Sequence, residues 1–417
     1  MVGPSLTIVT DPNGTRRGRL RNEAETGRDA RGRVNCYLTF GVDLWFIFAK
    51  NQLRMIFEDL LRIVRRAGMG CAACVCLFGV SEFSARAQKK EYMPDIQGVL
   101  RGKIEYQPEM GSGRFEVRNA RLSLSGKVPL RSEYKLEVDL CDEYSIKMKD
   151  AWVRIRPVGN LRLTIGQQRM PFTIDAHRNP SAQFFANRSF IAKQVGNVRD
   201  VGFQIGYDFT GKDGRTILSV DAGIFNGELL ENQKSAWFKT PTYSARIQFH
   251  PVKWLSLVPS IQHQMIADRQ ASYTSIDFGA LARLGDLHLE AEFLHKSYDS
   301  QAFADCNALN TMALWRQRVG KEGSFLESIS YLCRYDWMQD HSSGKSGFIQ
   351  DADGKPTGQL VLTDTERHRM TVGLTFSIRN PLFPTHIRLN YEKYWYPRGG
   401  AKVSEQDKLV CELMVRF

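Results

Sequence analysis

A hairpin between residues 153 and 169 carries guanidinium groups at alternating positions. Arg154 and Arg156 precede a turn at residues 157–160, and Arg162 and Arg169 follow it. Apolar residues fill the positions between them, so one face of the hairpin is basic and the other is apolar. Guanidinium groups bind carboxylates and phosphates, and this face could therefore attract anions. The arginines would face water in a soluble sandwich and the lumen in a membrane barrel.

The residues that usually perform catalysis or bind metals do not form a known motif. The eight histidines are scattered, without a G-x-S-x-G or H-E-x-x-H pattern. Cys71, Cys74 and Cys76 lack the second cysteine pair of a zinc site. Residues 351–354 begin like a calcium loop, but Leu362 occupies the twelfth position, where a calcium loop has Glu. We therefore predict no enzymatic activity, no catalytic residue, no metal and no cofactor.

Composition limits how the chain could meet a membrane or a nucleic acid. The 417 residues have a net charge of +12, and mean hydropathy is −0.34. No run approaches the roughly 20 apolar residues that a helical span needs. The basic residues of the later segments are dispersed rather than gathered in one block, which argues against a nucleic-acid groove.

An export signal is predicted unusually far from the first residue. Arg62, Arg65 and Arg66 precede an apolar segment that ends in Ala85-Arg86-Ala87, the order of a secretory signal peptide. We predict a signal peptide at residues 62–87, cleavage after Ala87 and an exported domain at residues 88–417. A short buried helix is the alternative. Residues 1–61 are predicted to be an overlong gene start or a disordered segment, with Met55 as the true start.

The exported part alternates apolar and polar residues in segments of about ten, which indicates strands. We predict an all-β fold, a transmembrane antiparallel β-barrel of 16 strands, with 14 as the alternative. An aromatic cluster at one strand end is predicted to form part of an interfacial girdle. Its members are Tyr391, Tyr394, Trp395 and Tyr396. Fifteen segments can be bounded, and the even strand number of bacterial barrels makes sixteen the prediction. They are 96–107, 114–125, 134–140, 153–156, 161–165, 201–209, 216–224, 243–249, 254–263, 287–295, 312–318, 325–336, 368–378, 385–394 and 408–417.

The last segment alternates strictly and ends in an aromatic residue, Phe417. This resembles the terminal strand by which outer-membrane barrels are recognised, so Phe417 is the predicted insertion signal. The outer membrane of a Gram-negative bacterium is the predicted location. The barrel-insertion machinery, membrane lipid and lipopolysaccharide are the predicted partners, and no nucleic acid is expected.

Three short motifs stand out in the first half of the exported part. Their residues are Asp150 and Trp152; Gly166, Gln167, Pro171 and Phe172; and Arg199, Asp200 and Gly202. In order and spacing they resemble the phosphate-selective porin O and P family, over residues 95–417. The resemblance implies a trimeric, water-filled channel whose loops lie on the outer face.

The stretch 173–198 resembles the family's loop that folds into the barrel and narrows it. Arg178, Arg188 and Lys193 are the predicted constriction residues, and Arg154, Arg156, Arg162 and Arg169 are predicted to line the lumen. An ordinary external loop is the alternative. We predict passive diffusion of small hydrophilic solutes with an anion or phosphate preference, or else a non-conducting structural or ligand-binding barrel. Five acidic residues weigh against a phosphate ladder: Glu133, Glu137, Asp139, Asp142 and Glu143.

Overall fold

The computed structural model describes residues 93–417 except 130, 143–144, 197, 228–236, 238–240, 267–270, 321–323, 381–382 and 401–404. These residues lie in the second of the chain's two units, Ala87–Phe417. The predicted upstream segment 1–61, the signal peptide 62–87 and the cleavage site lie outside the described residues.

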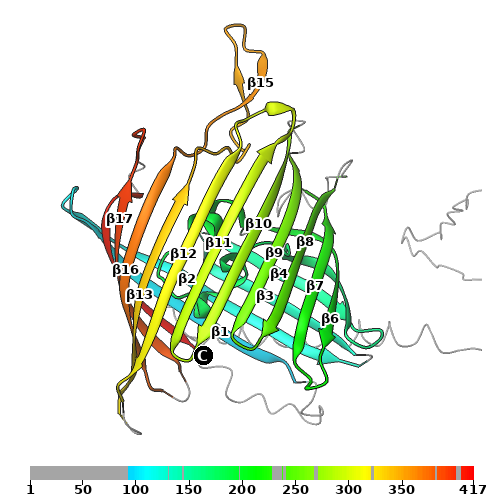
Figure 1. Ribbon diagram of the computed structural model, residues 1–417, viewed down its shortest axis with the longest axis vertical. Coiled ribbons are helices and arrows are strands. Elements are labelled where there is room, and N and C mark those ends of the chain that lie inside the picture. Colours follow the sequence, from blue (N-terminus) through cyan, green and yellow to red (C-terminus); the bar gives the residue numbers. More distant parts are fainter. Residues whose placement is uncertain are drawn as a thin grey trace, which may run out of the picture. The chain divides into compact units, whose positions relative to one another are not determined.

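Sixteen strands close into one antiparallel barrel, which confirms the predicted fold and strand number (Figure 1). Each strand pairs with its neighbour in the chain, apart from β13, which pairs with β16, and β18, which closes the barrel on β1. The strands are β1 Asp95–Gln107, β2 Ser112–Val128, β3 Ser132–Asp142, β4 Ser145–Ile155, β5 Leu161–Arg169, β6 Arg199–Thr210, β7 Thr216–Phe225, β8 Thr242–Val252, β9 Leu255–Ile266, β10 Ala271–Leu284, β11 Leu287–Tyr298, β12 Cys306–Arg318, β13 Leu326–Met338, β16 Arg367–Ile378, β17 Thr385–Trp395 and β18 Lys408–Arg416.

The two ends of the barrel differ in the length of their connections. At the end where the chain terminates, strands are joined by short turns such as 253–254 and 285–286. At the other end lie the connections 170–198 and 339–366; the latter carries the hairpin β14 (Phe348–Gln350) and β15 (Pro356–Leu360), which projects beyond the barrel in Figure 1. Outer-membrane barrels have short periplasmic turns and longer extracellular loops, so the hairpin marks the extracellular end.

The barrel is apolar outside and polar inside. On β1, Leu100 and Ile104 are exposed on the outer surface, while Arg101 and Lys103 between them are buried in the interior. Such alternation, with polar residues inward, is the reverse of a soluble protein and suits a strand between lipid and lumen. None of the helices among the described residues is long and apolar enough to cross a membrane.

The alternation divides the predicted aromatic cluster between the two surfaces. Tyr391 and Trp395 are exposed on the outer surface, as a girdle requires. Tyr394 is buried inside, where it packs against Phe190, and its ring stacks on Tyr396. The girdle prediction is therefore wrong for Tyr394, because neighbouring residues of a strand face opposite sides, and for Tyr396, which packs against the same inner cluster as Tyr394.

The chain terminus closes the barrel. The carbonyl oxygen of Phe417 accepts a hydrogen bond from the Gly98 amide at 2.6 Å, and its own amide donates to the Gly98 carbonyl at 3.0 Å. A Cβ atom at Gly98 would lie 2.2 Å from the Phe417 ring. The glycine therefore makes room for the terminal aromatic ring on the outer face. The role of Phe417 as an insertion signal stays a prediction.

Candidate functional site

The connection between β5 and β6, residues 170–198, is hydrogen-bonded to inward-facing side chains on the barrel wall. The Thr173 amide donates to Ser260 Oγ at 3.0 Å, and the Ile174 amide donates to Glu292 Oε1 at 2.6 Å. These acceptors belong to β9 and β11. Further contacts reach β13, β16 and β18: the Phe190 amide to Asp336, Arg369 to the Arg188 carbonyl, and Pro180–Ala182 against β18. The loop therefore lies inside the barrel along the β9–β18 wall.

Aromatic and aliphatic side chains hold the two ends of the loop to the same wall. Phe172 and Phe190 are buried together with Ile191 in one core cluster with residues of β11, β12, β13 and β17. The guanidinium carbon of Arg369 lies 4.6 Å from the centre of the Phe190 ring. This apolar anchor inside a polar lumen explains why the loop holds one position against the wall.

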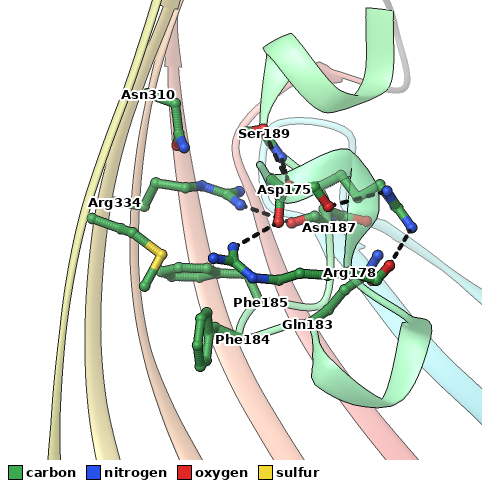
Figure 2. Close-up of a pocket in the computed structure, with 11 residues that line it drawn as sticks. Asp175, Arg178, Gln183, Phe184, Phe185, Asn187, Ser189, Asn310 and Arg334 are labelled. Atoms are coloured by element: carbon green, nitrogen blue, oxygen red, sulfur yellow. Dashed lines mark hydrogen bonds and ion pairs between the residues drawn. The ribbon is translucent and has the colours of Figure 1, made fainter. Parts of the chain in front are cut away.

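A buried carboxylate links two parts of loop 170–198. Asp175 accepts hydrogen bonds from Arg178 at 3.0 Å and from the Ser189 amide at 3.2 Å (Figure 2). Burial raises the pKa of this carboxyl, but Arg178, Arg188 and Arg334 outweigh burial and lower the pKa to about 2. Asp175 is therefore an anion throughout the physiological pH range.

Arg178 serves as an anchor in this arrangement. Its guanidinium pairs with Asp175 and with Glu290 of β11, and these partners raise its pKa against the opposing effect of burial. Arg178 and Glu290 neutralise each other's charge in the ion pair that they form. The structure thus places Arg178 against the wall, beside the Phe184 ring, in the region shown in Figure 2.

An arginine-rich cavity of about 370 Å³ lies beside the loop, on the side of β3–β8. All four predicted lumen residues line it: Arg154, Arg156, Arg162 and Arg169. The sequence analysis did not assign the remaining cations to the lumen. They are Lys135, Arg199 and Arg246, and the acidic residues of the lining are Asp150 and Asp221.

The cations of this arginine-rich cavity differ in how far they are neutralised. Arg162 pairs with Asp208 and Asp221, and Arg154 pairs with Glu133 at 3.1 Å. In contrast, Nε and Nη2 of Arg169 have no hydrogen-bond partner among the described residues. An uncompensated guanidinium in a polar cavity is a site for a passing anion.

Arg188 extends the positive region into the loop. Its guanidinium donates to the backbone carbonyls of Asp175, Ala176 and Arg178, and no carboxylate among the described residues pairs with it. Burial lowers its pKa; the nearby charges of Arg121, Arg199 and Arg118 lower it further, and Asp175 opposes them, with a result of about 10. Arg188 keeps its charge at neutral pH. The arginines that act on it belong to β2 (Arg118 and Arg121) and to β6 (Arg199), so Arg188 adds to the positive potential on that side of the lumen.

Lys193 lies further along the loop. Its amino group is 2.5 Å from Glu405 in the connection between β17 and β18, and half of its side chain remains exposed. Lys193 and Arg188 both line a second cavity, of about 140 Å³, with Arg114, Arg118 and Lys408. The structure thus places Arg188 and Lys193 on one cavity and Arg178 apart from it. Their roles in a constriction stay a prediction.

The acidic residues noted in the sequence are neutralised in pairs where their side chains are described. Glu137 and Asp139 both pair with Arg121, at 3.0 and 2.9 Å, and Glu133 pairs with Arg154 and Arg156. The side chains of Asp142 and Glu143 lie outside the described set.

The three sequence motifs meet at one place on the wall. Asp150 of β4 accepts a hydrogen bond from Arg199 of β6 at 2.8 Å. Gly166 of β5 between them has φ +127°, and a Cβ atom there would lie 2.3 Å from the Ala151 carbonyl oxygen. The side-chain Nε2 of Gln167 donates to the Met148 and Lys149 carbonyls.

The remaining motif residues bind or pack nearby. Asp200 accepts from the amides of Val201 and Gly227, at 2.7 and 2.6 Å. A Cβ atom on Gly202 would lie 2.2 Å from the Ile224 carbonyl oxygen, and Pro171 accepts from Ser244 at its carbonyl. Trp152 faces the arginine-rich cavity under the Arg154 guanidinium.

The sequence of this chain was compared with models of known protein families. Residues 103–258, which carry all three motifs, match the family model described as phosphate-selective porin O and P. This part of the chain therefore matches the family that its motifs resemble. The family predicted from the sequence is confirmed by this match. Joined to the closed barrel of sixteen strands, it identifies the chain as an outer-membrane porin channel.

Solved structures share the porin fold at low sequence identity. OmpF of Salmonella typhi, in complex with daunomycin, has a TM-score of 0.55 at 10% identity, with 78% of this chain and 98% of that chain covered. The channel DcaP of Acinetobacter baumannii has 0.51 at 12%, covering 79% and 98%. An anion-selective porin from Comamonas acidovorans has 0.50 at 13%, covering 78% and 99%. No curated protein sequence matches the porin significantly.

Proposed function

We propose that the porin conducts small hydrophilic anions by passive diffusion through the space between loop 170–198 and the β3–β8 wall. The observation that carries the proposal is the excess of cations over carboxylates in the lining of the arginine-rich cavity, where Nε and Nη2 of Arg169 have no hydrogen-bond partner among the described residues. A basic lining at a narrow place favours anions, because it lowers their electrostatic barrier and raises that of cations.

The paired residues determine what kind of preference to expect. Arg154 and Arg162 are held by carboxylates, so they contribute less net charge than their number indicates. The surplus rests on few groups, chiefly Arg169, Arg188 and Arg246. We therefore propose a general anion preference rather than exclusive selection of phosphate.

The test is single-channel recording on the full chain in a planar bilayer, with reversal potentials in a tenfold potassium chloride gradient. We expect stable conductance steps and anion selectivity, with the selectivity reduced in Arg169→Gln and Arg188→Gln. Arg318→Gln is the matched control, since Arg318 is an exposed arginine at the end of β12, outside both cavities. A folded barrel without conductance would support the alternative of a structural or ligand-binding barrel.

The porin is also proposed to act as a homotrimer. The structure of OmpT from Vibrio cholerae described as the trimer form shares the fold, with a TM-score of 0.50 at 9% identity, covering 78% of this chain and 98% of that chain. Native mass spectrometry of the detergent-extracted porin would detect three copies, and a single copy would contradict the proposal.

A further inference from the structure

The connection 339–366 leans sideways at the extracellular entrance, and we call it the mouth arm. It leaves β13 after Met338 and enters the neighbouring strand β16 at Arg367. The Leu360 amide nevertheless donates to the Ala302 carbonyl at 2.7 Å, in the connection between β11 and β12. The arm therefore reaches across β12, and its outer part is the hairpin β14–β15 that projects beyond the barrel in Figure 1.

A lysine of the inner wall holds the foot of the mouth arm. The amino group of Lys296 on β11 donates to the Ser342 carbonyl at 2.8 Å. The same nitrogen lies 3.8 Å from the centre of the Tyr273 ring and 4.7 Å from that of Tyr298. The Tyr298 hydroxyl also donates to the Ser342 carbonyl at 2.7 Å and accepts from the Ser342 amide at 3.0 Å. Both polar groups of the Ser342 backbone are thus bound to the wall.

The surroundings of Lys296 explain why this contact matters. The side chain is buried, and no carboxylate among the described residues pairs with its amino group. Burial of an amino group is unfavourable unless hydrogen bonds or other polar contacts replace water. For Lys296 these contacts are one carbonyl of the mouth arm and two aromatic rings. The interactions that compensate its burial are therefore the interactions that hold the arm.

The mouth arm has its own internal hydrogen bonds, which do not involve the wall. The His341 amide donates to the Asp364 carbonyl at 3.0 Å, and the Thr363 amide donates to the His341 carbonyl at 2.9 Å. The Ser343 amide donates to Thr363 Oγ1 at 2.8 Å. The two legs of the arm are thus joined to each other, so the arm can move as one body about its attachments to β13 and β16.

We propose that Lys296 is a positioning residue that keeps the extracellular entrance of the channel open by holding the mouth arm against the inner wall at β10–β12. Tyr298 shares this role through its hydroxyl, and Leu360 adds an apolar contact to the same two tyrosine rings. Without the contact to Ser342, the arm pivots on β13 and β16, and its hairpin swings across the entrance. The proposal concerns the entrance and does not depend on an anion preference at loop 170–198.

The first experiment is single-channel recording of the full-length variant Lys296→Met, which keeps the length of the side chain and removes the donor. We expect brief closures about tenfold more often than in the unaltered porin, because one buried hydrogen bond is lost. The conductance and the reversal potential of the open state should not change, whereas a general loss of structure would alter both. Lys393→Met is the matched control, because Lys393 lies on β17 with its partly exposed side chain on the outer surface.

Tyr298→Phe tests the same contact without touching the lysine. It removes the two hydrogen bonds between the hydroxyl and Ser342, and the same closures are expected. Folding of each variant is checked by its migration on gels without heating. If Lys296→Met fails to fold, Tyr298→Phe decides the question.

Hydrogen exchange of the backbone amides separates swinging from unfolding. In both variants the Ser342 amide should exchange about tenfold faster, since its contact to the wall opens more often. The Thr363 amide should keep its rate, because its bond to His341 lies within the mouth arm. Faster exchange at both amides would show that the arm unfolds, and this result would overturn the proposal.

Removal of the hairpin identifies the part that closes the entrance. Replacement of residues 348–360 by two glycines in the Lys296→Met porin should abolish the added closures. Closures that persist without the hairpin would come from another loop and would overturn the proposal. An unchanged closing rate in both Lys296→Met and Tyr298→Phe would also overturn it.

Discussion

Arg199 donates from Nε to Asp150 Oδ1 over 2.8 Å, although the two residues stand on β6 and β4 with β5 between them. The same carboxylate binds Lys135 of β3 at 2.9 Å. One buried acid therefore ties together the wall of the arginine-rich cavity over four strands, and it also cancels part of the charge of that cavity.

Asp150→Asn is expected to have opposite effects on selectivity and stability. Removing the carboxylate charge leaves more positive charge facing the cavity. The reversal potential should therefore shift toward the equilibrium potential of chloride. Loss of two charge-assisted hydrogen bonds should cost about 2 kcal/mol of unfolding free energy. Bilayer recordings and urea unfolding in detergent measure the two effects. Asp213→Asn, in the exposed turn before β7, should change neither, and a shift toward cation selectivity in Asp150→Asn would contradict this assignment.

Gly166→Ala is expected to impair folding more than its small size indicates. The residue combines φ +127° with a space that a methyl group cannot enter, since Cβ would lie 2.3 Å from the Ala151 carbonyl oxygen. A cost of about 3 kcal/mol is expected. The control is Gly159→Ala in the turn between β4 and β5, where φ is +50° and no atom lies within 4 Å, and where about 1 kcal/mol is expected. Refolding yields should rank in that order, and equal yields would refute the steric argument.

Glu290→Gln is expected to make loop 170–198 more mobile, although the substituted residue lies on β11 and not in the loop. The glutamine keeps the volume of Glu290 but loses the charge that holds Arg178 to β11. We expect noisier single-channel currents, because the loop then samples more than one position at the narrow part of the lumen. Asp286→Asn removes a partly exposed carboxylate beside Arg318 and should leave the noise unchanged. Quiet currents in Glu290→Gln would show that the apolar anchor holds the loop alone.

The sequence predicted the barrel well because its pattern is local. Alternation along each strand and the terminal aromatic residue are visible in single segments, so fifteen of the sixteen strands and the inward side of Arg154 and Arg162 followed from the period of two. β10 was not among the bounded segments, and the number sixteen came from the even strand count of bacterial barrels. The pattern of paired and uncompensated cations could not be predicted in that way. Arg169 and Arg162 lie on the same strand, yet only Arg162 meets carboxylates, which come from β6 and β7. Arg121 and Arg246 lie on β2 and β8, where the same alternation points them inward, but the sequence analysis did not single them out.

The Asp175 carboxylate is expected to make loop anchoring sensitive to strong acid only. Its pKa is lowered to about 2 in the folded porin, below the ordinary value near 3.8, so ionised Asp175 stabilises the folded loop. The sign follows from linkage: this contribution, about 2 kcal/mol, is complete above about pH 4 and is lost as the pH falls through about 2. Current noise should therefore stay constant from pH 7 to 4 and rise only near pH 2. Asp175→Asn should be noisy at every pH, since it lacks the charge that binds Arg178. A rise in the noise of the unaltered porin at pH 5 would show that another group controls the loop.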